Sequence, residues 1–260
     1  MNELVRVETA DAVRTITVNR PEKLNALNSE VLELLDKAVA DAAADDGLRC
    51  LIVTGAGEKA FIAGADIGEL AQLTPLQGRE HARRGQSVLD RIERLPIPSI
   101  AAINGYAYGG GLELAIACTL RVASENARMG LPETSLGILP GFGGTQRLAR
   151  LVGKAKASEL VLTSDKGITA AIAERIGLVN QIVPAGQAHA AARELARRIA
   201  ANGPTAVRYA LEAIRSGVEM GLAQGQLYEA TLFGLCAATE DMKEGMNAFL
   251  EKRPAKFTGR

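Results

Sequence analysis

The stretch "AYGGGLELAIAC" (residues 107–118) joins three consecutive glycines to an apolar run that contains one carboxylate, Glu113. The preceding run, residues 97–109, is also apolar, so the chain here passes from a buried strand through glycines into a helix. Such a turn gathers unpaired backbone N–H groups and the positive end of a helix dipole, which together stabilise negative charge. The simpler interpretations are a tight turn and an acid that complements the dipole. Because the residues around Glu113 are apolar on every side, we expect a fully buried helix and a functional carboxylate.

A second glycine turn, "AFIAGADIGEL" (60–70), follows the apolar strand "LRCLIVTG" (48–55) and opens another helix-like stretch. Taken alone it is a weak signal, because Asp66 could simply cap that helix. Two such turns, each after a buried strand, could aim two N–H groups at one oxygen. That geometry is an oxyanion hole.

The third element is "MGLPETSLGILPGFGGTQRL" (129–148), in which Glu133 follows Pro132 and precedes a glycine-rich loop. Taken in isolation, Pro132 and Glu133 are better interpreted as the first turn of a short helix. The glycines do not follow the G-x-G-x-x-G order, "GKA" at 153 lacks the P-loop Ser or Thr, and no serine lies in G-x-S-x-G. Dinucleotide, P-loop and serine-hydrolase interpretations are therefore disfavoured.

Strand and helix patterns alternate in the first half of the chain. Residues 13–18 alternate like a strand, residues 29–46 repeat apolar positions on one helix face, and residues 48–55 read as a buried strand. Apolar strands that alternate with helices predict an α/β fold with parallel pairing. The functional residues should lie where strands run into helices.

Beyond residue 154 the strand signals nearly stop, and only "VNQIVP" (179–184) resembles a strand. Glycine and proline separate the helix-like segments, which span residues 156–164, 169–178, 188–202, 204–216, 227–239 and 241–253. This alanine-rich helical part offers faces for packing on the core or on another subunit.

The composition limits the classes of partner. The chain has 260 residues with 30 basic and 30 acidic side chains, and no basic run is longer than a pair. We therefore expect no nucleic-acid or membrane partner. No apolar run reaches the ~18 residues of a membrane span and the N-terminus does not resemble a leader, so we expect a cytoplasmic protein.

Cysteine and histidine are scarce. Cys50, Cys118 and Cys236 are far apart in apolar contexts, which indicates buried thiols rather than disulfides or a zinc site. The two histidines, His81 and His189, lie in polar helix-like surroundings and are interpreted as satisfied or solvated. We expect no metal site and no catalytic triad that depends on histidine.

Three motifs in order resemble the enoyl-CoA hydratase/isomerase (crotonase) superfamily. They are "FIAGADI" (61–67), "NGYAYGGGLELAIAC" (104–118) and "LPETSLGILPGFGGTQRL" (131–148), and "RPEKLNAL" (20–27) and "EGMNAFLEKR" (244–253) extend the likeness over nearly the whole chain. The resemblance implies an α/β, crotonase-type spiral of ββα units over residues 1–200. It also implies a helical C-terminal oligomerisation region over residues 201–260, and assembly as a homo-trimer or a dimer of trimers.

Carried over residue by residue, the resemblance implies that the N–H groups of Ala65 and Gly110 hold the thioester oxygen of an acyl-CoA. Glu113 and Glu133 match the two acids of hydratases, one of which activates water while the other protonates C2. Which acid does which stays open. Hydration both removes and adds a proton, so two acids with pKa values tuned by partial burial are needed. No metal and no cofactor are implied, since coenzyme A is part of the substrate.

The resemblance also assigns contacts to the substrate and its coenzyme A. These residues are Lys23, Ala26, Ala63, Ala65, Asp66, Ile67, Gly110, Pro132, Gly141, Phe249 and Lys252. Phe249 and Lys252 match a C-terminal pair that reaches the ligand of a neighbouring subunit. Lys23 and Lys252 could equally be solvated surface lysines.

Two positions depart from the family pattern. Gly68 stands where lysine is common, which removes one candidate contact to the phosphates of coenzyme A, and Thr119 stands where aspartate commonly follows the cysteine. The second departure puts a supporting interaction in doubt but leaves the pair of acids intact.

The resemblance implies reversible syn hydration of trans-2-enoyl-CoA to 3-hydroxyacyl-CoA in fatty-acid β-oxidation or related acyl-CoA catabolism. Alternatives within the family are a 3-enoyl-CoA isomerase and a more specialised hydratase. An alternative of another class is a noncatalytic acyl-CoA-binding scaffold, which the retention of both Glu113 and Glu133 disfavours. The acyl pocket wall is expected to include residues 69–84.

Overall fold

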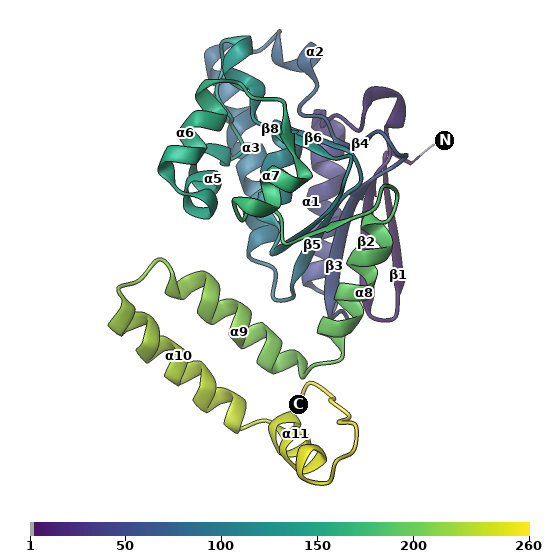
Figure 1. The fold of residues 1–260 in the computed structure, drawn as a ribbon, viewed down its shortest axis with the longest axis vertical. Helices are drawn as coiled ribbons and strands as arrows, with labels where there is room; N and C mark the ends of the chain where they lie inside the picture. Colours follow the sequence, from purple (N-terminus) through teal and green to yellow (C-terminus); the bar gives the residue numbers. More distant parts are fainter. Residues whose placement is uncertain (1–2) are drawn as a thin grey trace.

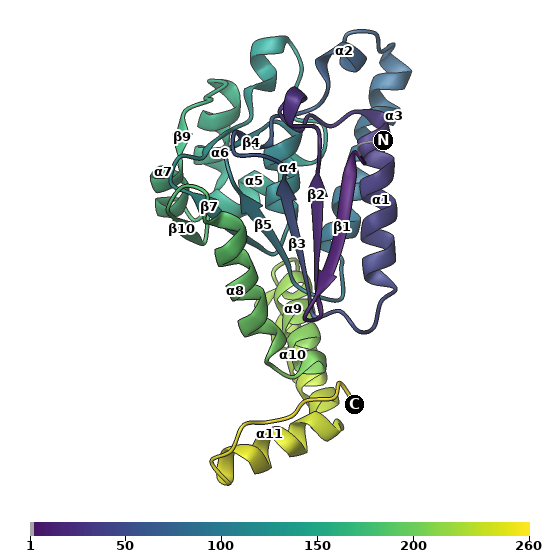
Figure 2. The same ribbon diagram turned by 90° about the vertical axis from the view of Figure 1, so that its right-hand side faces the viewer.

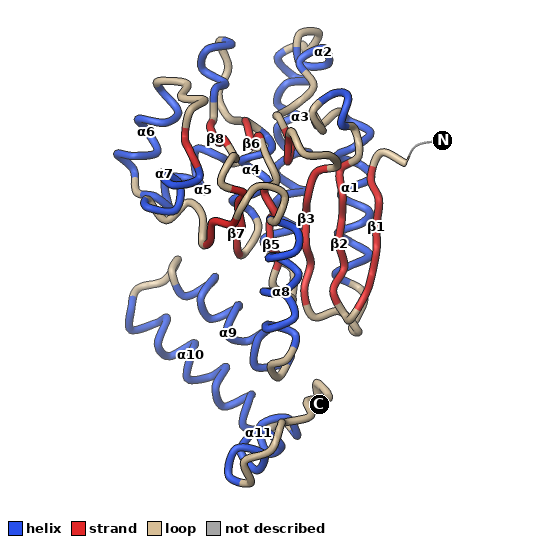
Figure 3. The backbone as a smooth tube through the Cα atoms, turned by 45° about the vertical axis from the view of Figure 1, so that its right-hand side comes forward, coloured by secondary structure: helices blue, strands red, loops and turns tan. Residues whose placement is uncertain are grey.

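A six-stranded sheet forms the centre of the computed structural model, which describes residues 3–260 (Figure 3). In spatial order its strands are β1 (Val5–Ala10), β2 (Val13–Val18), β3 (Cys50–Gly55), β5 (Ser99–Ile103), β7 (Leu120–Ser124) and β10 (Gln181–Val183). β1 pairs antiparallel with β2, and the other pairings are parallel. β3 and β5 are buried along their whole length. The predicted α/β architecture with apolar parallel strands is confirmed, and β10 is the late strand that the sequence indicated.

A second, four-stranded sheet was only partly visible in the sequence. It contains β4 (Ala60–Ile62), β6 (Tyr106–Tyr108), β8 (Arg128–Gly130) and β9 (Ile168–Thr169), in that order. The run 97–109, which we read as one strand, is wrong in this detail because it divides into β5 and β6 of different sheets. The division falls at Gly105, where a Cβ would lie 2.2 Å from the carbonyl oxygen of Lys59. Only glycine permits this close approach of two backbones.

Three strand pairs, each followed by helices, build the spiral. In each pair the first strand joins the six-stranded sheet and the second joins the four-stranded sheet. The pairs are β3–β4, followed by α2 (Ile67–Leu70) and α3 (Pro75–Glu93); β5–β6, followed by α4 (Gly110–Ala117); and β7–β8, followed by the 3-10 helix η2 (Pro132–Leu136), α5 (Gly144–Val152) and α6 (Lys154–Leu162). This repetition is the expected ββα spiral.

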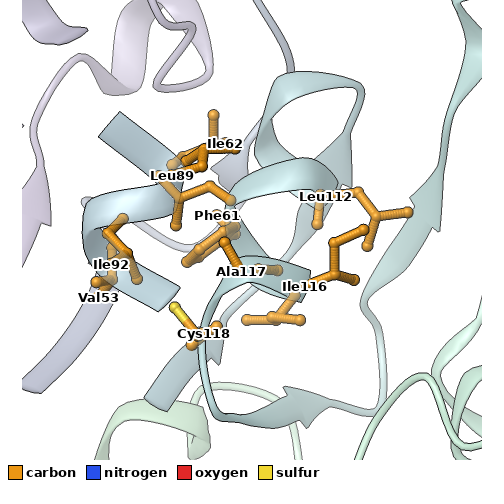
Figure 4. Packing of buried hydrophobic residues seen from close by; sticks show 14 of the residues in the cluster. Val53, Phe61, Ile62, Leu89, Ile92, Leu112, Ile116, Ala117 and Cys118 are labelled. Atoms are coloured by element: carbon orange, nitrogen blue, oxygen red, sulfur yellow. The ribbon is translucent and has the colours of Figure 1, made fainter. Parts of the chain in front are cut away.

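Helices cover both faces of the large sheet (Figures 1 and 2). On one face α1 (Ser29–Ala43), α3 and α4 enclose the main core, and on the other face α8 (Ala188–Ala200) packs its alanines against β3, β5 and β7. All eight residues of α4 are buried, as predicted for the helix that carries Glu113. Figure 4 shows this packing. The labelled side chains are Val53, Phe61, Ile62, Leu89, Ile92, Leu112, Ile116, Ala117 and Cys118.

The last three helices project away from the two sheets (Figures 1 and 2). They are α9 (Pro204–Gly217), α10 (Leu222–Ala237) and α11 (Glu240–Leu250), and they follow α6, α7 (Ala170–Arg175) and α8, so the predicted helical C-terminal part is confirmed. α9 to α11 expose large apolar side chains, among them Ile214, Val218, Leu222, Leu227, Phe233, Phe249 and Leu250. The division at residue 200 and the role of this region in oligomerisation remain predictions. Across residues 3–260, every helix is too short or too polar to span a bilayer.

Two predictions about single side chains are wrong. Cys50 and Cys118 are buried, but Cys236 on α10 is partly exposed, because the projecting helices bury little of their own surface. The Nε2 atoms of His81 and His189 are buried and find no hydrogen-bond partner among the residues that the structure describes, so these side chains are neither satisfied nor solvated at that nitrogen. Burial lowers the pKa of both imidazoles.

Candidate active site

The turn after β4 presents the N–H of Ala65 to a cavity. The N–H of Leu27 donates to the carbonyl oxygen of Gly64 at 2.8 Å, and the N–H of Asp66 donates to the carbonyl oxygen of Leu27 at 2.8 Å. Gly64 and Asp66 therefore both turn toward Leu27. Since successive groups of an extended chain face opposite ways, the N–H of Ala65 faces away from Leu27, on the side where Ala65 lines the cavity.

The turn after β6 supplies a second free N–H, at Gly110. This residue begins α4, where the first N–H groups have no partner within the helix. Gly109 has φ 50°, which favours glycine, and a Cβ there would lie 3.6 Å from the Cα of Gly64. The two glycine turns thus lie against each other. In the described part of the chain, neither the Ala65 nor the Gly110 N–H donates to another protein group.

Glu113 lies one turn into α4 with its carboxylate against the N-terminus of α5. Its Oε1 accepts hydrogen bonds from the N–H of Phe142 at 2.8 Å and of Gly144 at 2.7 Å. A Cβ on Gly144 would approach the Glu113 side chain to 2.8 Å, so glycine is needed for the contact. The side chain is 2% exposed, and this burial raises its pKa to about 7 although the two N–H donors favour the anion.

Glu133 lies across the cavity in η2. Pro132 and Glu133 do form the first turn of a short helix, the alternative interpretation of this motif, and the same turn points the carboxyl at the glycines. A Cβ on Gly109 would lie 2.7 Å from its Oε1, and its Oε2 is buried without a partner among residues 3–260. Burial raises the pKa of Glu133 to about 7, and its charge raises the pKa of Glu113.

One cavity of about 560 Å³ contains both acids and both glycine turns. Its wall includes part of the predicted segment 69–84. The lining residues of that segment are Leu70, Leu73, Thr74, Pro75, Gly78, His81 and Ala82. The wall also includes the apolar residues Leu136, Ile138, Leu139 and Phe142. An apolar cavity with a few convergent polar groups is typical of a site for a small molecule with a hydrophobic tail.

The structure gathers most of the predicted site residues and leaves others outside. Those that line the cavity are Ala63, Ala65, Ile67, Gly110, Glu113, Pro132, Glu133 and Gly141. Lys23 and Ala26 do not line it but stand on either side of Leu24 and Asn25, and the carbonyl oxygen of Leu24 accepts from the N–H of Ala63 at 3.0 Å. Asp66 caps α2 and pairs with Arg20 at 3.4 Å.

Phe249 and Lys252 are not brought to the cavity. Phe249 lies on α11 and Lys252 just after it, at the opposite end of the molecule from α2, which borders the cavity (Figure 1). Phe249 is 82% exposed. A contact between these two residues and the cavity of the same chain is excluded by this arrangement, so their predicted contact with a neighbouring subunit's ligand stays a prediction.

Sequence reasoning missed the groups that hold Glu113. "GFGGTQ" was tested against the dinucleotide-binding order and given a substrate contact at Gly141, but the binding of the carboxylate by its Phe142 and Gly144 N–H groups was not predicted. The signal was a glycine-rich turn before a helix, an anion-binding arrangement. At the departing position Thr119, the hydroxyl accepts from the N–H of Ser99 at 3.2 Å and the Thr119 N–H donates to the Ser99 hydroxyl at 3.0 Å. Gly68 donates its N–H to Asp66 at 3.1 Å.

The half-buried Glu133 carboxyl makes the stability of the fold depend on pH. Its pKa rises from 4.5 to about 7 on folding, so the folded state binds the proton more tightly, and stability falls as pH rises through this window. Glu133→Gln should therefore raise the free energy of unfolding by roughly 1–3 kcal/mol at pH 8 and leave it nearly unchanged at pH 4.5. Denaturant titrations at the two pH values check this. Equal effects at both would contradict the raised pKa.

The comparisons with known proteins agree with this geometry. A model of the family "Enoyl-CoA hydratase/isomerase" matches residues 8–260. The chain is 45% identical over 249 residues to short-chain-enoyl-CoA hydratase of Clostridium acetobutylicum, a match that covers 96% of this chain and 95% of the relative. It is also 45% identical over 255 residues to crotonyl-CoA hydratase of Syntrophomonas wolfei, with 98% of each chain covered.

Comparison of the fold with solved structures points to the same family as the comparison of the sequence. The crystal structure of enoyl-CoA hydratase from Bacillus anthracis matches with a TM-score of 0.96 and 42% identity, over 99% of this chain and 100% of that one. The likeness thus spans the sheets, the site and the projecting helices. On this evidence, the chain belongs to the enoyl-CoA hydratase/isomerase family.

Proposed function

We propose that the chain adds water reversibly, in the syn sense, to short trans-2-enoyl-CoA thioesters and gives 3-hydroxyacyl-CoA. It is an enoyl-CoA hydratase, a hydro-lyase, by its likeness to such enzymes over its whole length. The observation that carries the proposal is the convergence of one buried carboxyl, one half-buried carboxyl and two free N–H groups in one apolar cavity. Each feature serves one requirement of the reaction.

The two N–H groups suit the thioester oxygen. Water attacks C3 of the enoyl group only as negative charge moves onto that oxygen, which takes on enolate character. Donors at Ala65 and Gly110, with the N-terminus of α4 behind the second, stabilise this charge more than that of the ground state. These hydrogen bonds therefore lower the free energy of the transition state more than that of the bound substrate, and so raise kcat rather than the affinity.

The unequal environments of the acids suggest how they divide the work. Glu113 accepts two backbone N–H bonds, which favour its anion, whereas the buried Oε2 of Glu133 has no partner in the described chain and favours the neutral acid. The charge of Glu133 raises the pKa of Glu113, and both pKa values lie at about 7, so near neutral pH one acid can be ionised while the other is protonated. We infer that Glu113 takes the proton from water and Glu133 delivers one to C2.

This division predicts a bell-shaped pH profile. Activity needs one acid ionised and the other protonated, and both pKa values lie at about 7, so kcat/KM for crotonyl-CoA should peak near neutral pH and fall on both sides. Initial rates between pH 5 and 9 check this. In Glu133→Gln the alkaline fall should disappear from the residual activity, because no carboxylic acid is left to lose. A flat profile in the wild type across that range would contradict the assignment.

The chemistry also limits what else is required. Addition of water changes no oxidation state overall, so we propose that the enzyme uses no cofactor beyond the coenzyme A of its substrate. We further propose a cytoplasmic enzyme of β-oxidation or related acyl-CoA catabolism, without nucleic-acid or membrane partners. The exposed apolar side chains of α9 to α11 support assembly through these helices into a homo-trimer or a dimer of trimers.

Mixing the purified protein with crotonyl-CoA tests the proposal. Hydration removes the conjugated double bond, so the absorbance of the enoyl thioester should fall, and a mass gain of one water should appear in the product. A parallel reaction with a 3-enoyl-CoA tests the isomerase alternative, in which that absorbance rises. Binding without turnover of either substrate would support a scaffold instead. A series of acyl lengths then gives the preferred substrate.

A further inference from the structure

We propose, building on the function above, that Arg147 is a positioning residue for hydration. Its guanidinium, held by Asp90 and Glu93 of α3, fixes the turn at residues 142–144 whose N–H groups hold the carboxylate of Glu113. Arg147 does not line the cavity. It would act on the reaction only through Glu113.

The first contact ties Arg147 to the turn. Its Nη1 donates to the carbonyl oxygen of Phe142 at 3.0 Å, on the residue whose own N–H binds Glu113. Gly143, with φ 101°, lies between the two N–H donors, and a Cβ there would come within 2.5 Å of Arg147 Nη1. The guanidinium is therefore packed directly on this peptide. If the guanidinium moves, the N–H groups of Phe142 and Gly144 change their orientation toward Glu113.

The second set of contacts fixes the guanidinium itself. Nε donates to Glu93 at 2.9 Å, Nη2 contacts Glu93 at 2.7 Å, and Nη2 also donates to Asp90. The Arg147 side chain is only 13% exposed, although each carboxylate is more than 40% exposed. Arginine can use three nitrogens at once in a fixed plane, which lysine cannot. One more residue of the same α3 face, Gln86, donates to the Gly141 carbonyl at 2.9 Å and holds the start of the loop.

The charge of Arg147 also acts on Glu113. Its cation favours the ionised carboxylate and lowers the pKa of Glu113, against the larger opposite effect of burial. The other titratable groups around the site are Glu133 on η2, which raises that pKa, and His81 on α3, whose ring lies 5.2 Å from that of Phe142. Removal of Arg147 would also leave the charges of Asp90 and Glu93 uncompensated. Both effects would make Glu113 harder to ionise.

Arg147→Met tests the proposal, with kcat, KM and the pH profile measured on crotonyl-CoA. We expect kcat to fall roughly 10- to 100-fold with a change of less than about threefold in KM, because the defect is one of geometry at the base. The pH at which kcat/KM falls on the acid side of the profile, called the acid limb, should rise by about one unit. The matched control is Arg150→Met on the same helix, whose side chain is 60% exposed and pairs with Glu219. It should behave like the wild type.

Arg147→Lys separates charge from geometry. Lysine keeps the cation but cannot bond Phe142, Asp90 and Glu93 together, so the acid limb should return toward its wild-type position while kcat stays below the wild type. Thermal melts of both variants verify folding. If Arg147→Met does not fold, the double variant Asp90→Asn, Glu93→Gln is measured instead. It removes the two exposed carboxylates that hold the guanidinium of Arg147. In this variant too, kcat should fall by a larger factor than KM rises.

Two outcomes would overturn the inference. One is a folded Arg147→Met protein with wild-type kcat and an unmoved pH profile. The other is an equal loss of kcat in Arg147→Met and Arg147→Lys while the acid limb of both pH profiles stays at its wild-type position. That result would indicate a purely structural role. Both are distinct from failure of the proposed function, in which the wild-type protein itself would not hydrate any enoyl-CoA, and the inference would fall with it.

Discussion

Glu113→Gln and Glu133→Gln are each expected to lower kcat for hydration by about 10² to 10⁴, the usual contribution of a positioned acid or base. The amide is nearly the same size, and the amide oxygen at position 113 can still accept the bonds from Phe142 and Gly144. The fold and the affinity for acyl-CoA should therefore stay close to those of the wild type. Stopped-flow rates with crotonyl-CoA, together with binding of a saturated acyl-CoA, check both parts.

Full hydratase activity in either glutamine variant would remove the two-acid mechanism. A 3-enoyl-CoA isomerase would then be the better assignment, because moving a proton between two carbons needs only one working acid. Loss of acyl-CoA binding together with activity would instead indicate that the variant has disturbed the cavity.

Gly110→Pro should lower kcat roughly 10² to 10³-fold with a smaller change in KM, since it deletes one N–H that faces the developing charge. Proline is tolerated at the first helical position, where the N–H has no helical acceptor. Gly110→Ala is the matched control. Its Cβ would meet Phe142 at 3.3 Å and Leu27 at 3.4 Å, so it introduces crowding at the same place but keeps the N–H.

The two variants separate crowding from the lost donor. A well-folded Gly110→Pro protein with wild-type turnover would show that this N–H is not an oxyanion donor and that the three glycines only form a turn. If alanine and proline lowered kcat equally, contact with Phe142 rather than the hydrogen bond would account for the loss. Thermal melts within a few degrees of the wild type exclude a folding defect.

The sequence predicted those parts of the fold that have a hydrophobic period or a long apolar run. β2, β3 and α1 lie where their patterns placed them, and the buried helix α4 follows its glycines. The second sheet was hidden because its strands have two or three residues, too few for a period to appear. The break between β5 and β6 depends on a backbone contact at Gly105 that no local pattern encodes.

The site was predicted through its side chains and motifs, and its backbone donors were found less completely. Glu113 was singled out as a carboxylate in an apolar run and Glu133 was assigned through the family motif, whereas the N–H groups that hold Glu113 are indicated in the sequence only by a glycine-rich turn before a helix. The exposure of Cys236 and Phe249 was equally out of reach, because it follows from helices that project from the core rather than from their local sequence.

In the proposed mechanism Glu113 and Glu133 act as one unit on one water molecule, and a double-mutant cycle tests this most directly. Hydration of crotonyl-CoA is measured for the wild type, Glu113→Gln, Glu133→Gln and the double variant under the same conditions. We predict that the double variant is little slower than the worse single variant, because either change alone already breaks the shared step. Losses that multiply in the double variant would show that the two acids act independently and would contradict the mechanism.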